Sequence, residues 1–229
     1  AKKSPVELEV FIHGALCCCL SGCCLFSSWL GGWSGNRGKC KQPCRRRHHS
    51  QDGNGFFFST KDLCALEVLP RLAEIGIVSL KIEGRLRKSD YVTNVVTAYR
   101  KALDCPVEEF EALQPSLRNI LAKTYGRKWS LGFLSKESSA DLIQHNSMGV
   151  AGLLCGKIVS TRSNGFEMEV ARRLHVGESI RIQPPSGDEG PSLTITRMSV
   201  DGQPALKALQ DTRCFINCDK DVAVGSYVF

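Results

Sequence analysis

The sequence lacks a membrane-spanning stretch and a secretory signal. Its one apolar run, residues 14–32, is short and rich in Ser, Gly and Cys, whereas a spanning helix needs about 20 consecutive apolar residues. The chain starts at Ala1 without a charged segment followed by a small-residue cleavage site. We therefore expect a cytoplasmic protein, with lipid attachment to cysteines beside basic residues as a minor alternative.

Acidic residues are absent from Val10 to Gln51. The same stretch carries six basic side chains within eleven residues, in a chain of formal net charge +7: Arg37, Lys39, Lys41, Arg45, Arg46 and Arg47. A charge run is often only a solvated surface, and that interpretation stays open. The functional alternative is a polyanionic partner such as RNA.

Mechanistic protease motifs are also absent. The sequence contains neither G-x-S-x-G nor H-E-x-x-H, so it offers no serine nucleophile elbow and no zincin helix. A Cys–His pair formed by residues distant in the sequence stays open. No internal repeat is visible.

Cysteine is abundant instead. The chain has twelve cysteines, and seven of them lie between His13 and His49. The adjacent residues Cys17, Cys18 and Cys19 cannot easily bridge one another, and disulfide scaffolds are typical of small secreted domains. Clustered thiols in a reducing compartment more often bind metal.

One set of four cysteines has the spacing C-x6-C-x15-C-x3-C: Cys17, Cys24, Cys40 and Cys44. Four thiolates can hold tetrahedral zinc or a [4Fe–4S] cluster. Structural zinc favours tight C-x2-C pairs, so the spacing moderately favours a cluster, whose net negative charge the basic run would offset. Cys18, Cys19 and Cys23 are predicted to be packing residues, and Cys64 a helix-core thiol with a weaker alternative as a ligand.

The first part of the chain predicts alternating strands and helices. Strands are expected at residues 6–14, 56–60 and 78–84, and helical pieces within residues 61–77. Residues 89–104 predict an amphipathic helix with Ser89 as its N-cap. This order implies a parallel α/β arrangement.

The part that follows residue 149 predicts six short strand segments. Asn164-Gly165 and Asp201-Gly202 are typical hairpin turns. Six short strands in about 80 residues indicate a small antiparallel β-barrel. We therefore divide the chain near residue 130, into domains 1–130 and 131–229.

The sequence resembles peptidase family U32 from Val6 to about Asp104. The residues that carry the resemblance are "ELEVFIHGALC", "NRGKCKQPCR", "KDLC" and "SLKIEGRLRKSDYV". The segment "LHVGESIRIQPPSG" is similar to the small β-barrel that ends many members. The fold class that the resemblance implies is a partial TIM-like barrel, made of its C-terminal βα units, followed by that small β-barrel.

Family resemblance also implies a cofactor and an activity. Members carry a [4Fe–4S] cluster on four cysteines, which correspond here to Cys17, Cys24, Cys40 and Cys44. Better-understood relatives support oxygen-independent hydroxylation of a tRNA wobble uridine, a 23S rRNA cytidine or a ubiquinone precursor, and those acting on RNA use prephenate-derived chemistry. The family name reflects early collagenase and protease assignments.

These features lead to an enzyme hypothesis with two alternatives. The first hypothesis is the cluster-bearing part of an RNA hydroxylation enzyme. The alternatives are a peptidase and a non-catalytic part that binds RNA or a partner. Expected partners are tRNA or rRNA and the N-terminal remainder of the barrel, with no membrane and no DNA.

Candidate catalytic residues lie at the ends of predicted strands, where (β/α) barrels place their chemistry. His13 ends the first strand, and Glu83 and Arg85 follow the strand at residues 78–84. A hydrogen-bonded structural histidine and a structural ion pair are the respective alternatives. The six basic residues between Arg37 and Arg47 are the candidate RNA-binding set.

Overall fold

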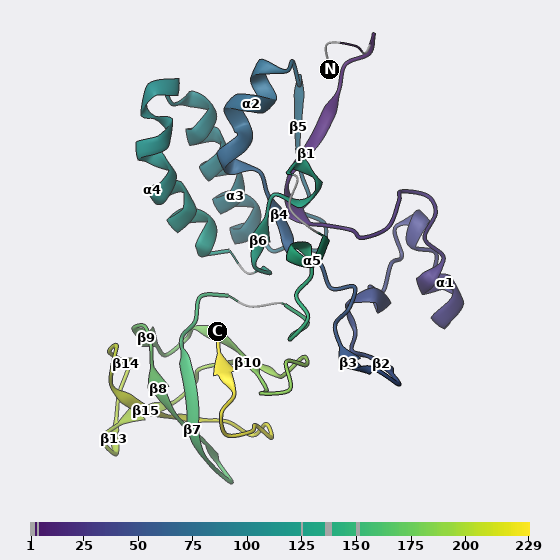
Figure 1. Cartoon of the computed structure of the whole chain (residues 1–229). Coiled ribbons are helices and arrows are strands. Elements are labelled where there is room, and N and C mark those ends of the chain that lie inside the picture. Colours follow the sequence, from purple (N-terminus) through teal and green to yellow (C-terminus); the bar gives the residue numbers. More distant parts are fainter. Residues whose placement is uncertain (1–2, 4, 125, 136–138, 150–151) are drawn as a thin grey trace. The chain divides into compact units, whose positions relative to one another are not determined.

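The computed structural model describes residues 3, 5–124, 126–135, 139–149 and 152–229. The chain divides into two compact units, Ala1–His145 and Asn146–Phe229 (Figure 1). Among the described helices, none has the length and apolar character needed to cross a membrane.

The first unit is built around a four-stranded sheet with the strand order β5-β1-β4-β6. The strands are β1 (Glu9–Ala15), β4 (Asp62–Cys64), β5 (Ser79–Ile82) and β6 (Trp129–Ser130). Strand β1 pairs in parallel with β5 and antiparallel with β4, and β4 pairs in parallel with β6. Strands β1 and β5, predicted at residues 6–14 and 78–84, are parallel neighbours as expected, whereas β4 is antiparallel to β1, so the sheet is mixed. The TIM-like barrel stays a prediction.

Strand β4 corrects the start of the helical pieces predicted within residues 61–77, whereas the helix Leu69–Glu74 confirms the later piece. All three residues of β4 are buried, because β1 and β6 pair with it on its two sides. The strand predicted at residues 56–60 is instead a turn that ends in one bridge between Thr60 and Ile143. Both differences arise because pairing with distant strands, rather than local pattern, decides the conformation.

The described residues of this unit form five α-helices. They are α1 (Phe26–Gly31), α2 (Leu69–Glu74), α3 (Ser89–Asp104), α4 (Phe110–Ala122) and α5 (Ser139–Leu142). Helix α3 confirms the predicted amphipathic helix, although Lys88 rather than Ser89 is the N-cap.

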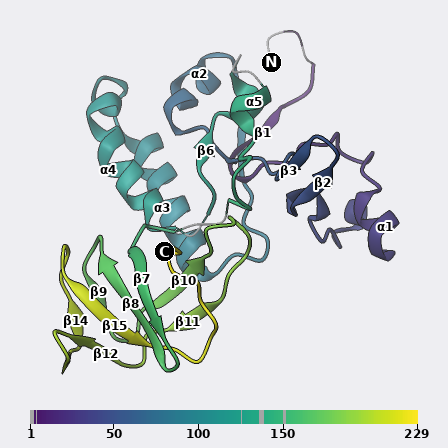
Figure 2. The ribbon, with the colours of Figure 1, turned by 60° about the horizontal axis from the view of Figure 1, so that its bottom comes forward.

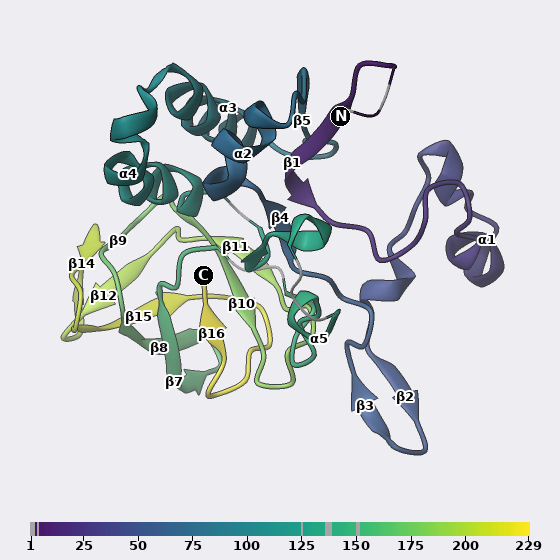
Figure 3. The same cartoon turned by 45° about the horizontal axis from the view of Figure 1, so that its top comes forward.

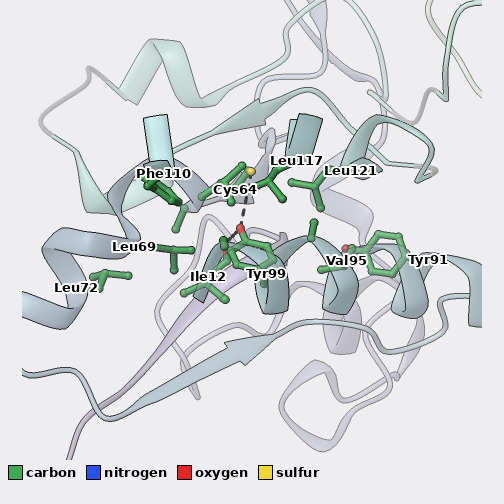
Figure 4. Packing of buried hydrophobic residues seen from close by; sticks show 14 residues of the cluster. Ile12, Cys64, Leu69, Leu72, Tyr91, Val95, Tyr99, Phe110, Leu117 and Leu121 are labelled. Atoms are coloured by element: carbon green, nitrogen blue, oxygen red, sulfur yellow. Dashed lines mark hydrogen bonds between the residues drawn. The ribbon is translucent and has the colours of Figure 1, made fainter. Parts of the chain in front are cut away.

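The buried face of α3 leaves several of its apolar residues exposed. Its buried residues are Tyr91, Val95, Ala98, Tyr99 and Ala102. By contrast, Val92, Val96 and Leu103 are 40–48% exposed. Figure 4 shows Val95 and Tyr99 packing with Ile12, Leu69 and Leu117 in one apolar core.

The boundary between the units lies at His145 rather than near residue 130. Residues 139–145 return to the first unit through backbone hydrogen bonds. Lys61 N–H donates to Leu142 O (2.8 Å), Gln144 N–H donates to Ser59 O (2.8 Å), and Phe56 N–H donates to His145 O (3.1 Å). The predicted domains 1–130 and 131–229 are corrected accordingly.

The second unit contains an eight-stranded sheet with the order β11-β10-β16-β7-β8-β15-β12-β13, in which every neighbouring pair given is antiparallel (Figure 2). Its strands are β7 (Gly156–Arg162), β8 (Gly165–Val170), β10 (Ser179–Gln183), β11 (Ser192–Thr194), β12 (Met198–Val200), β13 (Gln203–Pro204), β15 (Arg213–Asn217) and β16 (Tyr227–Val228). A separate pair joins β9 (Leu174–His175) and β14 (Lys207–Ala208).

All six predicted strand segments contain strands, and the Asp201-Gly202 turn is confirmed between β12 and β13. Both of its residues have positive φ, 50° and 77°, as a tight type I′ hairpin requires. Strands β11 and β13 are the edges of the sheet, and its closure into a barrel stays a prediction.

The second unit has its own apolar core, which includes Phe166, Met168, Ile182 and Ile216, each at most 1% exposed. A domain with its own core can fold alone. We expect the fragment 146–229 to unfold cooperatively in urea and to give a β-rich circular dichroism spectrum without metal. A disordered fragment beside a folded whole chain would contradict this boundary.

Candidate functional site

The Cys-rich segment forms one long loop that leaves β1 after Ala15 and ends before β2 (His48–Ser50). It contains α1 and two single 3-10 turns, Gly35–Arg37 and Pro43–Arg45. Strands β2 and β3 (Gly53–Gly55) then make a short hairpin. Figure 3 shows the loop and the hairpin extending away from the end of β1.

Arg45 fastens the base of this loop. Its guanidinium donates to Thr60 O at 2.7 Å and to Leu16 O at 2.5 Å, and the residue is 5% exposed. The Thr60 hydroxyl donates to the same Leu16 carbonyl at 2.6 Å. The point where the chain leaves β1 is therefore held beside the point where it enters β4.

Short polar contacts organise the interior of the loop. The Asn36 side-chain amide donates to Gly22 O (3.1 Å) and Cys24 O (3.2 Å). The Ser27 hydroxyl accepts a hydrogen bond from Lys41 N–H at 3.1 Å and donates to Cys40 Sγ at 3.7 Å. These bonds join the first half of the loop, with Cys24, to the second half, with Cys40.

The predicted ligand cysteines lie in this loop with thiol neighbours. Burial raises the pKa of the Cys44 thiol to about 11, and the nearby thiols of Cys18, Cys40 and Cys17 add to the rise. Desolvation raises the pKa of the Cys19 thiol, and the nearby thiol of Cys24 adds to the rise. The thiols of this loop thus affect the pKa of Cys19 and of Cys44.

Two of these sulfurs already accept backbone hydrogen bonds. Cys19 N–H donates to Cys17 Sγ (3.4 Å), and Gln42 N–H donates to Cys40 Sγ (3.3 Å). Such bonds stabilise thiolates and help set the potential of iron–sulfur centres. Cys18, Cys19 and Cys23 are exposed, so the prediction that they are packing residues was wrong.

The cysteine thiols are chemically suitable ligands for a metal ion or an iron–sulfur cluster, but they do not lie close enough together to form a site. Within the described ranges, no three His, Cys, Asp or Glu side chains stand close enough to hold a metal ion. Binding would require the thiols to converge. The positive-φ glycines Gly22 and Gly38 give the loop backbone the freedom to do so.

The basic residues of the loop fall into two groups. Arg37, Lys39, Lys41 and Arg46 are exposed and Arg47 is half-buried, with its guanidinium 4.8 Å from the Phe56 ring centre. Arg45 is buried and donates to the two carbonyls at the loop base. We therefore assign Arg45 a structural role, and RNA contact by the other five stays a prediction.

Cys64 lies apart from this loop, on strand β4 rather than in a helix. It is 7% exposed and packs among the residues of the apolar core. Its Sγ lies 3.8 Å from the Tyr99 hydroxyl (Figure 4). The structure thus places Cys64 as a core thiol.

His13 is buried and hydrogen-bonded beneath the loop. It is 2% exposed, and its Nδ1 lies 3.3 Å from the Tyr99 hydroxyl. That hydroxyl gives its proton to Ile12 O at 2.8 Å, so His13 Nδ1 carries a proton and donates. Burial lowers the pKa of His13 to about 4, against a smaller opposing effect of Asp62. His13 is therefore neutral at pH 7.

Asp62 and Arg127 are buried charged residues that sequence reasoning missed. Asp62 Oδ2 accepts from Arg127 N–H (3.1 Å) and from the Arg87 guanidinium (3.3 Å), while its Oδ1 lies 3.5 Å from the Arg127 guanidinium. Asp62 and Arg127 side chains are only 4% and 5% exposed. The sequence feature that could have revealed them is Asp62 in "KDLCAL". A single acidic residue beside an apolar run needs a cationic partner when it is buried.

Positive charge exceeds negative charge at this buried centre. The pKa of Arg127 is lowered to about 10, mainly by burial and also by repulsion from Arg45 and Arg87, against the attraction of Asp62. Arg87 also lies over the Tyr91 ring at 4.7 Å. The C-terminal end of β1 and the starts of β4 and β6 thus surround a cationic region.

Glu83 and Arg85 link the end of β5 to the loop. Glu83 Oε1 accepts from Arg85 N–H at 2.7 Å, and the Arg85 guanidinium donates to Gly38 O. Gly14 has φ +118°, and a Cβ there would lie 2.6 Å from Glu83 O. Close approach of β1 to Glu83 therefore requires glycine at this position. The structure thus places Glu83 and Arg85 in contact with each other, and their catalytic role stays a prediction.

Comparison with known proteins identifies the family of this site. The model of peptidase family U32 matches residues 1–144. The chain belongs to peptidase family U32. The match covers the four-stranded sheet, the Cys-rich loop and the buried centre around Asp62.

Several curated members of the family are similar to this chain. An uncharacterised protease of Methanocaldococcus jannaschii is 34% identical and aligns with 79% of this chain and 49% of its own length. The tRNA hydroxylation protein P1 of Bacillus subtilis is 36% identical, over 58% and 35%. The 23S rRNA 5-hydroxycytidine C2501 synthase of Escherichia coli is 30% identical, over 79% and 30%. The chain spans at most about half the length of these relatives.

Protonation of His13 gives a test of the buried centre. Its unfolded pKa of 6.5 falls to about 4 in the folded chain, so the unfolded state binds the proton first. Stability from this residue is complete above about pH 6.5 and is lost as the pH falls toward 4, by up to roughly 3 kcal/mol. Urea unfolding at several pH values measures the loss.

The matched variants are His13→Gln and His49→Gln. His49 is exposed, so its replacement should leave the pH dependence of the unfolding free energy unchanged. His13→Gln should flatten that dependence between pH 6.5 and 4. Equal slopes in the His13 variant and the parent chain would contradict a neutral buried imidazole.

Proposed function

We propose that this U32 protein supports oxygen-independent hydroxylation of an RNA base, with a [4Fe–4S] cluster held by the Cys-rich loop. The observation that carries the proposal is the loop itself: four spaced thiols in an acid-free basic segment, fastened to the ends of β1 and β4. Relatives named as tRNA and rRNA hydroxylation proteins support RNA as the substrate.

Cys17, Cys24, Cys40 and Cys44 would hold the cluster. A bound cluster would supply one-electron chemistry, with a prephenate-derived hydroxyl source as part of the proposal. Backbone N–H groups donate to Cys17 and Cys40 sulfurs, and Ser27 donates to Cys40. The exposed basic side chains of the loop would contact RNA phosphates.

Below the loop, the cationic centre around Asp62 would favour anionic groups at the strand ends. Two guanidinium groups flank the Asp62 carboxylate, and Arg45 lies near enough to affect Arg127. These groups lie beside the C-terminal end of β1 and the starts of β4 and β6, because β4 runs antiparallel to β1.

Peptidase activity is the alternative named by other relatives, among them a collagenase of Porphyromonas gingivalis. A cysteine peptidase needs a thiolate beside a histidine that takes its proton. Cys64 and His13 are register partners across β4 and β1. Burial, however, raises the pKa of Cys64 and lowers that of His13 to about 4. Both shifts oppose the ion pair, which favours the RNA hypothesis.

Iron content tests the ligand assignment. Protein purified without oxygen should be brown, with broad absorbance near about 400 nm, as thiolate-bound iron–sulfur centres are. Replacing any one of the four proposed ligands by Ser should lower the iron content, whereas Cys105→Ser should not. Stoichiometric zinc without iron would contradict the assignment.

Arg45 supplies a second arm of the same measurement. Arg45→Gln removes the charged hydrogen bonds that fasten the loop base, so it should lower iron retention although Arg45 is no ligand. Arg46→Gln, which changes an exposed neighbour, should retain iron. Equal iron content in both variants would mean that the loop needs no fastening.

RNA mass spectrometry tests the function. Total tRNA and rRNA from a strain that lacks the gene should lose one hydroxylated base, and the restored gene should return it. The gene with Cys24→Ser should fail to restore the base, and that with Cys105→Ser should succeed. Unchanged RNA together with altered peptide turnover would favour the peptidase alternative instead.

A further inference from the structure

Two tryptophans of the Cys-rich loop are exposed although tryptophan side chains are usually largely buried. The chain has three tryptophans, and Trp29 and Trp33 are 80% and 45% exposed. Leu30 between them is 58% exposed. Large exposed apolar groups that lie together generally mark a binding surface.

The exposed rings continue into a row of aromatic contacts. Trp29 stacks on Phe26 with ring centres 6.5 Å apart and planes 30° apart. Phe26 lies 5.9 Å from the His48 ring, and His48 lies 5.2 Å from Phe58, which is 49% exposed. We call these four residues, Trp29, Phe26, His48 and Phe58, the aromatic row. It runs from α1 to the β2–β3 hairpin.

Trp33 lies beside this row with a cation over its face. Lys41 Nζ is 4.3 Å from its ring centre. Its backbone is fixed at both polar groups: Trp33 N–H donates to Ser27 O at 3.2 Å, and Ser28 Oγ donates to Trp33 O at 3.1 Å. A backbone held in this way loses little freedom when a ligand binds.

Charge decides which kind of ligand this surface fits. No acidic residue occurs from Val10 to Gln51, and exposed cations lie in the segment that follows α1: Arg37, Lys39, Lys41 and Arg46. A polyanion with apolar flat faces matches rings and cations together. Unpaired nucleic acid has that chemistry, since each nucleotide joins a phosphate to a base with two π faces.

The rings also distinguish unpaired from paired RNA. Bases within a duplex stack on each other, so their faces cannot reach a protein side chain, whereas loop nucleotides can be splayed onto aromatic rings. We propose that Trp29 and Trp33 are stacking platforms for unpaired bases, with Arg37, Lys39 and Lys41 as phosphate contacts. The proposal rests on RNA as the substrate and assigns the unpaired segment to these rings.

Fluorescence titration of the purified protein tests the proposal. An unstructured 12-nucleotide RNA should quench tryptophan emission and bind more tightly than a fully paired duplex of the same strand length. Trp29→Ala/Trp33→Ala should weaken binding by about tenfold or more, as measured with a labelled RNA, because base–aromatic stacking is lost. Phe133→Ala, which removes a 68% exposed ring outside the row, should leave affinity unchanged.

Salt dependence separates stacking from charge. The double tryptophan variant should keep the slope of affinity against salt, because stacking releases no counterions. Lys39→Gln/Lys41→Gln should reduce that slope by up to about two phosphate contacts. A tryptophan variant that loses slope but not affinity, or that binds RNA as the parent protein does, overturns the proposal.

Other occupants of the surface give different results. Anionic phospholipid vesicles that bind through both tryptophans, with RNA affinity unaffected by their replacement, would assign the surface to a membrane and overturn the proposal. Acrylamide quenching that fails to reach Trp29 and Trp33 in the RNA-free protein would show that protein covers them, with the same consequence.

Failure of this proposal differs from failure of the proposed function. A strain carrying the double tryptophan variant that retains both RNA binding and the hydroxylated base refutes the platforms but leaves the reaction intact. Loss of RNA binding in that variant, in a protein whose deletion changes no RNA base, supports the platforms and refutes the reaction.

Discussion

The buried guanidinium of Arg45 is the contact on which the site depends. It donates to Leu16 O, which follows β1 and lies 29 residues before Arg45 in the sequence. It also donates to Thr60 O, which precedes β4 and lies 15 residues after Arg45. Each charged hydrogen bond contributes about 1.5–3 kcal/mol, but removing a guanidinium from water costs several kcal/mol. Because these terms nearly offset, the main effect of Arg45 is position. It fixes where a 32-residue basic loop begins and ends.

The loop depends on this fastening because its own secondary structure is short. Its own helix α1 has only six residues, with a left-handed Gly32 at its end and no side-chain cap. Such a helix is too short to be stable alone. Asn36 and Ser27 then tie the halves of the loop to each other, so the cysteines, basic residues and exposed rings share one locally ordered segment.

Sequence patterns predicted the elements that local periodicity decides. Helix α3 has the predicted bounds because its sixteen residues repeat apolar groups on one face, and all six predicted strand segments of the second unit contain strands. Strand β4 was missed because three residues carry too little pattern and the pairing with β1 and β6 decides their conformation.

The candidate site was only partly visible for a related reason. Cysteine spacing and the missing acids are local features, so the loop could be recognised. The roles of individual arginines could not, because Arg45 and Arg46 are identical in type and adjacent in sequence. One is 5% exposed and bonded to two carbonyls, and the other is exposed. Asp62 acquires its meaning only through Arg87 and Arg127, which lie 25 and 65 residues away.

The loop and the buried centre are connected through Arg45, Thr60 and Asp62. Thr60 accepts from Arg45, and Asp62, two residues later, holds Arg87 and Arg127. Arg45 also repels Arg127 and contributes to lowering its pKa. Cys44 precedes Arg45 in the chain, so this thiol and the segment that leads to Asp62 share one anchor, the guanidinium of Arg45.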